Sequence, residues 1–211
     1  IPLRLVGSEM CIRDSNAVDT ETFKAIQADM LHDKFDWYYR DTISCPGDGM
    51  SQFIHPFFIN SLVETSKETF SMLFPILNVL SPTSIIRIKA NSTHKTLDTI
   101  ETPLHIDVMS PGSLTAIFYM NTNNGYTYFK DGTKVKSAEN RLVVFPSNLP
   151  HAGATCTDEL RRVVINFNYM PDIENNIWKE LKTDSDLQYG KLWEDKACLL
   201  YTSDAADEGL G

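Results

Sequence analysis

The sequence is poor in cysteine, has no long apolar run and carries no excess of positive charge. No segment approaches the length of about 20 apolar residues that crosses a bilayer, so a membrane protein is not expected. The formal net charge of −9 disfavours non-specific binding to nucleic acid or to an anionic membrane, although it is compatible with a local basic groove. No internal repeat or Pro/Gly/Ser-rich linker is present, and 211 residues suit one domain.

The two ends of the chain are related to each other through their coding DNA. If residues 198–203 are written with the codons TGT CTC TTA TAC ACA TCT, the reverse complement in a shifted frame encodes Met-Cys-Ile-Arg-Asp, the sequence of residues 10–14. Residues 6–15 and 198–208 therefore resemble translated transposase adapters from sequencing libraries. We expect residues 1–15 and 198–211 to be adapter-derived, and a single domain to span residues 16–197.

Setting these ends aside leaves Cys45 and Cys156, which are too few for a disulfide framework or a zinc cluster. A reducing cytoplasm is therefore expected, and it would be the host cytoplasm if the gene is viral. The formal charge of the remaining chain is −6, because residues 198–211 hold three acidic side chains and no basic one, and residues 1–15 are neutral overall.

The first part of the chain shows helical patterns. Asp19 or Thr20 can cap a helix that places Phe23, Ile26 and Met30 on one face. Residues 35–39 are expected to form a strand or the edge of a loop. A capping box at residues 61–64 would open a second helical region, which a proline at position 75 should kink or divide. The apolar stripe of that region consists of Phe70, Leu73, Leu77 and Leu80.

From residue 82 onward the pattern changes to short β segments separated by turn residues such as Pro111-Gly112 and Asp131-Gly132. Short strands at this even spacing predict a mainly β (α+β) fold, a sandwich or jelly-roll barrel with N-terminal supporting helices. A closing helix is expected over 172–182. The expected strands are 84–90, 103–108, 113–121, 125–129, 133–136, 141–146, 150–154 and 161–169.

His105-Ile106-Asp107 is the most informative motif. Alternate side chains of a strand share a face, so His105 and Asp107 would point the same way while Ile106 packs behind them. A histidine from a distant strand would complete a two-His-one-carboxylate metal site with open positions, which suits iron(II). His151, which lies 46 residues after His105, is the natural third ligand. The alternative for the His-x-Asp pair alone is a surface ion pair.

Residues 161–169 alternate like a barrel strand. If the apolar residues at 163, 165 and 167 face the sandwich core, Arg162 and Asn166 face the interior with the three metal ligands. Arg162 can then form a bidentate pair with the distal carboxylate of a chelating 2-oxo acid such as 2-oxoglutarate. Arg161, on the opposite face, is less suited to this role. The alternative is that both arginines are solvated strand-edge residues.

Residues 102–169 resemble the double-stranded β-helix of the 2-oxoglutarate/Fe(II) oxygenases, closest to the prolyl 4-hydroxylase-like branch. They are also similar to small oxygenases of tailed phages of aquatic bacteria. The core of such a fold would span about 84–169. The matching motifs, in the order of the family, are His105-x-Asp107, the segment AIFYMN at 116–121, Gly125-x-Thr127-x-Phe129, and His151 followed by Arg162-x-x-x-Asn166.

The resemblance adds candidates for the site. It implies that Tyr119 hydrogen-bonds the co-substrate carboxylate, although a core aromatic is nearly as good an explanation. Strand alternation, independently of the resemblance, puts Arg87 and Lys89 on one face with Ile85, where they would line the pocket or lie on a solvated strand edge. The family's usual double glycine is replaced by Asn124-Gly125, and the turn is retained because asparagine tolerates left-handed backbone geometry.

What the resemblance implies about activity is a dioxygenase that binds Fe(II), 2-oxoglutarate and O2, and it also allows ascorbate as an accessory reductant. Such an enzyme hydroxylates a C–H bond while converting 2-oxoglutarate to succinate and CO2. The branch favours a peptidyl proline or another protein side chain as substrate, whereas a small molecule or a nucleobase fits the wider superfamily. The alternatives are a cupin-like metal barrel with a non-oxidative or sugar-binding role, and a barrel without catalysis.

Overall fold

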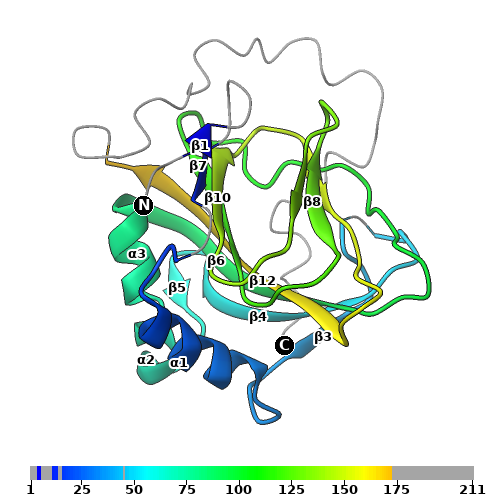
Figure 1. The fold of residues 1–211 in the computed structure, drawn as a ribbon. Coiled ribbons are helices and arrows are strands. Elements are labelled where there is room, and N and C mark those ends of the chain that lie inside the picture. The colour runs from blue at the N-terminus through cyan, green and yellow to red at the C-terminus, as the bar shows by residue number, and fades with distance from the viewer. Residues whose placement is uncertain (1–3, 6–10, 14–15, 45, 173–211) are drawn as a thin grey trace.

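Two antiparallel sheets and three helices form the part of the chain that the computed structural model describes, which is residues 4–5, 11–13, 16–44 and 46–172 (Figure 1). The strands of the larger sheet are β1 (Arg4–Leu5), β2 (Cys11–Arg13), β3 (Tyr38–Arg40), β4 (Gln52–Ile59), β5 (Leu62–Val63), β6 (Pro82–His94), β7 (Leu114–Tyr119), β10 (Leu142–Pro146) and β12 (Arg161–Pro171). Their order is β1-β2-β10-β7-β12-β6-β4-β3, with β5 paired to β4. The smaller sheet has the order β11-β8-β9. Its strands are β8 (Tyr126–Phe129), β9 (Lys134–Lys136) and β11 (His151–Gly153).

The helix α1 (Thr20–Leu31) begins where the sequence predicted it. The Asp19 carboxylate accepts a hydrogen bond from the backbone N–H of Thr22 at 2.9 Å, which satisfies one of the free donors at the helix start. None of the helices in the described ranges has the length and apolar character needed to cross a bilayer. The residues that α1 buries are Phe23, Ile26 and Met30.

The second helical region consists of two short helices, α2 (Lys67–Ser71) and α3 (Phe74–Leu80). Pro75 lies in the first turn of α3, where its missing N–H would have had no helical partner, so the proline divides the region. The predicted capping box at 61–64 is wrong. Ser61 has a φ of 64° in the turn between β4 and β5, and Ser66 caps α2 instead.

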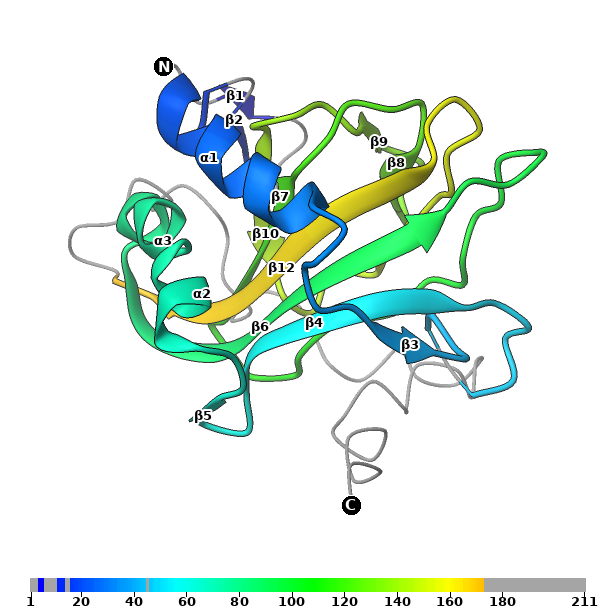
Figure 2. The ribbon, with the colours of Figure 1, turned by 90° about the horizontal axis from the view of Figure 1, so that it is seen from below.

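Alternate residues of the central strands face two separate apolar cores. One core lies between the larger sheet and the helices, which cover one face of that sheet (Figure 2). The other lies between the two sheets. On β7, the residues that face the helices are Leu114, Ala116 and Phe118, and those that face the smaller sheet are Ile117 and Tyr119. Strand periodicity therefore places one set of side chains on the face where the candidate site lies.

The strand β12 lies at the centre of the larger sheet, between β6 and β7. Its residues Val163, Ile165 and Phe167 belong to the helix-side core, as the alternation predicted. The intervening positions face the smaller sheet. In the register with β6 these pairs are Arg162 with Thr93, Val164 with Asn91, Asn166 with Lys89, and Asn168 with Arg87.

Other expectations need correction. Residues 103–108 do not form a strand; His105 makes an isolated bridge to His151, and the segment is otherwise irregular. The strand β4 was not predicted, although it lies between β3 and β6 and carries part of the cavity wall. The expectation for residues 35–39, a strand or the edge of a loop, agrees with β3, which begins at Tyr38. The helix expected over 172–182 lies outside the described residues apart from Asp172. Within residues 1–15, β2 pairs with β10 at the side of the larger sheet.

Candidate metal centre

His105 and His151 are held together through their backbones. The N–H of His105 donates to the carbonyl oxygen of His151 at 2.9 Å, and the N–H of His151 donates to that of His105 at 3.0 Å. This bridge joins the irregular segment before β7 to the first residue of β11. It brings two histidines that are distant in sequence to adjacent positions.

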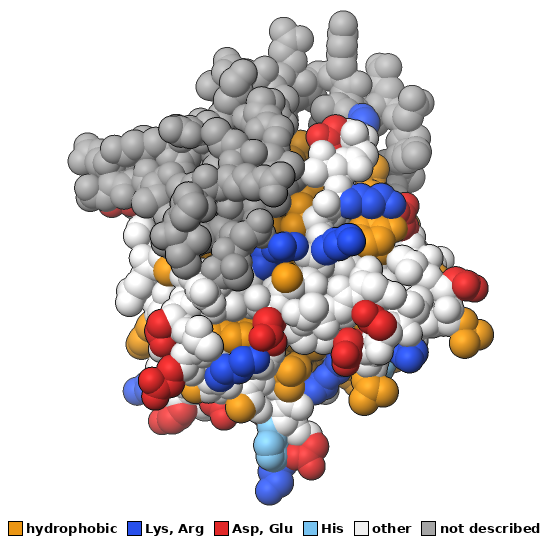
Figure 3. Space-filling model, in the orientation of Figure 1, with side chains coloured by type: hydrophobic (Ala, Val, Ile, Leu, Met, Phe, Trp, Pro, Cys, Tyr) orange, Lys and Arg blue, Asp and Glu red, His pale blue; other side chains and the backbone are white. Residues whose placement is uncertain are grey.

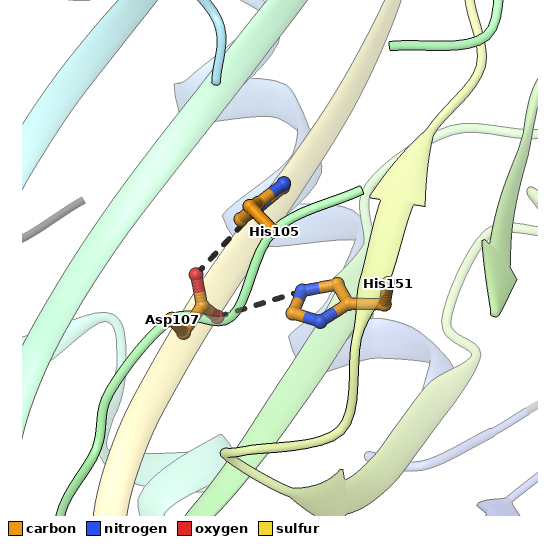
Figure 4. A group of neighbouring side chains, drawn as sticks. All are labelled: His105, Asp107 and His151. Carbon is orange, nitrogen blue, oxygen red and sulfur yellow. Dashed lines mark ion pairs between the residues drawn. The ribbon is translucent and has the colours of Figure 1, made fainter. Parts of the chain in front are cut away.

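The carboxylate of Asp107 faces both imidazole rings (Figure 4). Its Oδ1 is 3.8 Å from Nε2 of His105, and its Oδ2 is 3.7 Å from Nε2 of His151. One ligand atom from each of the three residues lies within 4.8 Å of the others. The three predicted ligands therefore converge on a single point, with two nitrogen donors and one carboxylate, a set that suits a divalent transition metal.

The hydrogen bonds of the two imidazoles leave Nε2 of each ring available to bind a metal. Nδ1 of His151 lies 2.9 Å from the carbonyl oxygen of Leu149, and Nδ1 of His105 lies 3.4 Å from that of Pro103. A carbonyl only accepts, so Nδ1 carries the proton in each neutral ring and Nε2 has a free lone pair. Nε2 of His151 is buried and has no hydrogen-bond partner among the described residues. A metal ion would satisfy this buried atom, so the residues present fit such a group.

Asp107 is oriented by residues of the larger sheet. Arg87, on β6, donates from Nη2 to Oδ1 at 3.1 Å, and Asn168, on β12, donates from Nδ2 to Oδ2 at 3.1 Å. Nε of Arg87 also donates to Oδ1 of Asn168 at 3.0 Å, so these two residues hold each other as well as the carboxylate. The hydroxyl of Thr115 donates to Oδ2 of Asp107 at 3.4 Å. Such partners fix the direction in which a ligating carboxylate points.

The charge states of His105 and Asp107 also suit metal binding. Burial lowers the pKa of His105 to about 4, with a further lowering from His151 against the opposing effect of Asp107. Burial raises the pKa of Asp107, but the charges of His151, Arg87 and His105 outweigh it and hold this pKa below its ordinary value. Near neutral pH, His105 is therefore neutral and Asp107 is ionised, which are the states in which they can ligate a metal.

The three ligands lie in the wall of a cavity of about 170 Å³. Its floor is formed by inward-facing residues of β6 and β12, and its other walls come from β4, β11 and the segment that follows β3. Arg162, Val164 and Asn166 all line it, as the strand alternation predicted. Arg161 points the other way, where its guanidinium donates to the carbonyl oxygen of Leu31 at 2.8 Å.

Arg162 is 5% exposed and is fixed in the cavity wall by hydroxyl groups. Its Nε donates to Oγ of Ser137, and its Nη2 donates to Oγ1 of Thr127, both at 2.9 Å. Among the described residues no carboxylate lies within ion-pair distance of Arg162. A buried guanidinium held only by neutral groups is suited to an anionic ligand, because it is costly to bury without one.

The backbone at Gly125, the first residue of the Gly125-x-Thr127-x-Phe129 motif, lies close to the aliphatic part of the Arg162 side chain. A Cβ at position 125 would lie 2.9 Å from Cδ of Arg162 and 2.9 Å from the carbonyl oxygen of Ala154. These separations are shorter than real Cβ contacts, so no larger residue fits without a shift. The departure from the family's double glycine falls on Asn124 and therefore spares the position that is sterically required.

Of the two other predicted co-substrate contacts, Asn166 lines the cavity and Tyr119 does not. The hydroxyl of Tyr119 donates to Oγ1 of Thr127 at 2.7 Å, and the ring is fully buried with the guanidinium of Arg162 5.5 Å from its centroid. Tyr119 thus supports Arg162 from behind and does not itself line the cavity. Asn166 does line the cavity, and its Oδ1 is buried without a hydrogen-bond partner among the described residues.

The sequence did not reveal the partners of Asp107. Arg87 was noted as a residue that would line the pocket or lie at a solvated edge, the alternation placed Asn168 on the inward face without a role, and Thr115 was not singled out. Their roles depend on the register between β6 and β12, which pairs Asn168 with Arg87. The one available signal was that Arg87 and Asn168 each occupy an inward position of an alternating strand.

Comparison with known proteins identifies the fold. No protein-family model and no curated protein matches the sequence. The structure is similar to an oxidoreductase of the 2OG-Fe(II) oxygenase family from Burkholderia pseudomallei, with a TM-score of 0.55 and 12% identity over 77% of this chain and 86% of that one. It is similar to a prolyl-4-hydroxylase from Pseudomonas putida, with a TM-score of 0.51 and 12% identity over 78% and 94% of the two chains. For SnoN, a non-heme alpha-ketoglutarate-dependent epimerase of nogalamycin biosynthesis, the TM-score is 0.56 with 11% identity over 78% of each chain.

These likenesses show that the chain has the fold of the 2-oxoglutarate/Fe(II) oxygenases, a mainly β double-stranded β-helix with supporting helices, as the motifs predicted. At identities this low they establish the fold alone, and function is inferred from the site itself.

Proposed function

We propose that the protein is an Fe(II)/2-oxoglutarate-dependent dioxygenase. One observation carries this proposal: a single cavity contains a convergent His-Asp-His group and a buried arginine that lacks an acidic partner among the described residues. His105, Asp107 and His151 would hold the iron, which when bound supplies the activation of O2 coupled to conversion of 2-oxoglutarate to succinate and CO2.

The chain itself would bind and orient the co-substrate. Arg162 would pair with the distal carboxylate of 2-oxoglutarate, with Thr127 and Tyr119 fixing the guanidinium and Asn166 offering a polar contact along the cavity wall. The apolar side chains at Ile117 and Val164, which also line the cavity, would limit the access of water to the reacting atoms.

A protein side chain, prolyl included, is the substrate that we favour, and hydroxylation is the reaction. The support is the resemblance to the prolyl 4-hydroxylase-like branch and the structural similarity to a prolyl-4-hydroxylase. The similarity to an epimerase shows that this fold also supports reactions other than hydroxylation. The compartment that we propose is a reducing cytoplasm, because Cys156 is buried and unpaired.

The test is anaerobic titration of the purified protein with Fe(II) and 2-oxoglutarate. Bidentate chelation of the co-substrate at such a site gives a weak visible charge-transfer band. His105→Ala and Asp107→Ala should each abolish the band, whereas His32→Ala, which changes an exposed histidine, should leave it intact. A band of undiminished intensity in both ligand variants would show that the metal binds elsewhere. A cupin-like barrel with a non-oxidative or sugar-binding role would instead bind metal without a response to 2-oxoglutarate.

A further inference from the structure

The loop between β3 and β4 forms part of the cavity wall. Thr42, Ile43, Ser44 and Pro46 line the cavity together with the candidate metal ligands. The loop lies at the right-hand end of the larger sheet in Figure 2. Acidic and basic side chains are mixed over the described part of the face in Figure 3, so charge on that face favours no single class of partner. Contacts inside the cavity, including those with this loop, are therefore the better basis for selecting a substrate.

One carboxylate organises the loop. Oδ2 of Asp48 accepts hydrogen bonds from the backbone N–H groups of Ile43 at 2.9 Å and Ser44 at 2.8 Å, and Oδ1 accepts from that of Met50 at 3.0 Å. The glycines on either side of Asp48 have φ of 79° and 71°, a backbone conformation that glycine adopts without strain. The Gly-Asp-Gly sequence therefore draws the two arms of the loop together.

Gln52, which begins β4, ties the same arm to the sheet. Its side chain is buried, and its Nε2 donates to the carbonyl oxygen of Thr42 at 3.2 Å and to that of Ile43 at 3.4 Å. The segment 42–44 is therefore held both from within the loop and from the larger sheet. Loops that carry functional residues are commonly positioned by a rigid scaffold in this way.

Ser44 connects the loop to the metal centre. Its side chain is 4% exposed, and its hydroxyl donates to the carbonyl oxygen of Pro103 at 3.2 Å. The same carbonyl oxygen lies 3.4 Å from Nδ1 of His105, whose Nε2 is the proposed metal donor. A carbonyl oxygen has two lone pairs and can accept both hydrogen bonds. Ser44 thus holds the group that orients the imidazole of His105.

We propose that Ser44 is a positioning residue for His105, and that the loop between β3 and β4 thereby couples substrate contacts to the geometry of the metal centre. This role rests on the proposed function, in which His105 holds iron and the cavity admits a substrate. The hydrogen bond at the second nitrogen of a metal-bound imidazole fixes the orientation of the ring. A substrate that contacts Thr42 or Ile43 therefore acts on the metal through the chain without touching the ion itself.

The experiment uses the full chain with Co(II) alone as the probe. Co(II) suits a site of this kind, and its visible d–d absorption depends on the arrangement of its ligands. Ser44→Ala should weaken Co(II) binding by roughly fivefold or more, measured by competition with a chelator, and should alter the d–d bands of the bound ion. Ser44→Thr keeps the hydroxyl donor and should restore both. A role in folding alone would lower the unfolding temperature and leave the spectrum of the bound ion unchanged.

The matched control is Ser51→Ala. Ser51 lies in the same loop, directly before β4, and outside the lining of the cavity, so its replacement removes an equivalent hydroxyl. It should change Co(II) affinity less than twofold. Asp48→Asn tests the loop itself. It replaces an acceptor of three backbone N–H groups and should weaken Co(II) binding in the same direction as Ser44→Ala, because the segment that carries Ser44 loosens.

The inference would be overturned if Ser44→Ala bound Co(II) with the affinity and spectrum of the parent chain, if Ser51→Ala had an equal effect, or if Ser44→Thr behaved like Ser44→Ala. An unchanged affinity in Asp48→Asn would reject the coupling through the loop, and so would absence of Co(II) binding by the parent chain. The proposed function fails separately, through absence of the charge-transfer band with Fe(II) and 2-oxoglutarate. The Co(II) measurement requires no 2-oxoglutarate and still reports on Ser44 in that case.

Discussion

His105 and His151 exchange two backbone hydrogen bonds, of 2.9 and 3.0 Å, across a bridge that belongs to neither sheet. These bonds hold the backbones of the two histidines side by side, and the ring centroids lie 4.8 Å apart. Asp107, two residues beyond His105, is held from the other direction by Arg87 and Asn168. Backbone and side-chain hydrogen bonds of the chain thus orient the three candidate ligands.

Asn168 should be required for tight metal binding. Its amide donates to Asp107 and accepts from Arg87, so Asn168→Ala frees the carboxylate to turn away from the histidines. Loss of such a supporting residue typically weakens metal affinity by about 10- to 100-fold. Competition with a chelator would measure this.

The matched control for Asn168 is Asn166→Ala. Both residues are asparagines on inward positions of β12, but Asn166 is not hydrogen-bonded to Asp107 and its Oδ1 has no partner among the described residues. Its replacement should leave metal affinity in the absence of 2-oxoglutarate within about threefold of the original. Equal losses in the two variants would contradict the specific role of Asn168.

Arg162→Ala should raise the 2-oxoglutarate requirement strongly and leave iron binding nearly unchanged. Removing one partner of a buried charge pair typically costs about 2–5 kcal/mol, which is more than tenfold in affinity. Arg161→Ala should have much the smaller effect, because Arg161 contacts the carbonyl oxygen of Leu31 on the opposite face. Succinate formation as a function of 2-oxoglutarate concentration separates the two, and a greater sensitivity of Arg161 would reject the proposed co-substrate pocket.

The metal-free protein should lose stability as the pH falls from 6.5 to 4. Burial lowers the pKa of His105 from 6.5 to about 4, so in this window the unfolded chain binds more protons than the folded one. The free energy of unfolding therefore decreases as the solution is acidified, by at most about 3 kcal/mol from this residue. Asp107, whose pKa is lowered, contributes only at lower pH.

Urea unfolding at a series of pH values, with and without His105→Asn, would isolate this contribution. The variant should show a shallower dependence on pH, although not a flat one, because burial also lowers the pKa of His55. An unchanged slope in the variant would indicate that His105 is not responsible.

Trimming residues 1–15 and 198–211 should leave metal binding unchanged if these ends are adapter-derived, as we propose. The trimmed segment includes β2, which pairs with β10 through three residues, so trimming removes one strand from the larger sheet. Removal of β2 would leave the edge of β10 open, yet a short edge strand adds little when the central strands are already paired. Thermal unfolding would measure the effect. A fall in midpoint by more than about 5 °C, which corresponds to roughly 2 kcal/mol for a domain of this length, would show that the first segment contributes real packing.

The sequence predicted those parts of the molecule that depend on local pattern. The alternation in 161–169 placed Arg162 and Asn166 in the cavity wall, and the N-cap of α1 is Asp19, one of the two candidates that the sequence offered. These succeeded because strand and helix periodicities are short-range properties of the chain. The motif His105-x-Asp107 was also informative, although its predicted strand is absent and the two side chains converge through the bridge to His151.

Features that depend on long-range pairing were missed. The strand β4 contains Pro56 at a register shift against β6, and an internal proline argues against a central strand. The contacts of Asp107 with Arg87 and Asn168 require that two strands about 80 residues apart in sequence align in one register. No local pattern specifies that alignment, since it results from the packing of both cores at once.

The proposed metal ligands come from both sides of the seam between the two sheets. His151 begins a strand of the smaller sheet, whereas Asp107 is anchored to β6 and β12 of the larger one. An ion bound there would cross-link the two sheets. Because the ion would bind only the folded protein, its binding would increase the free energy of unfolding. The survival time of the protein against proteolysis should then follow the supply of iron in the cell, so that molecules left without metal are removed before they accumulate.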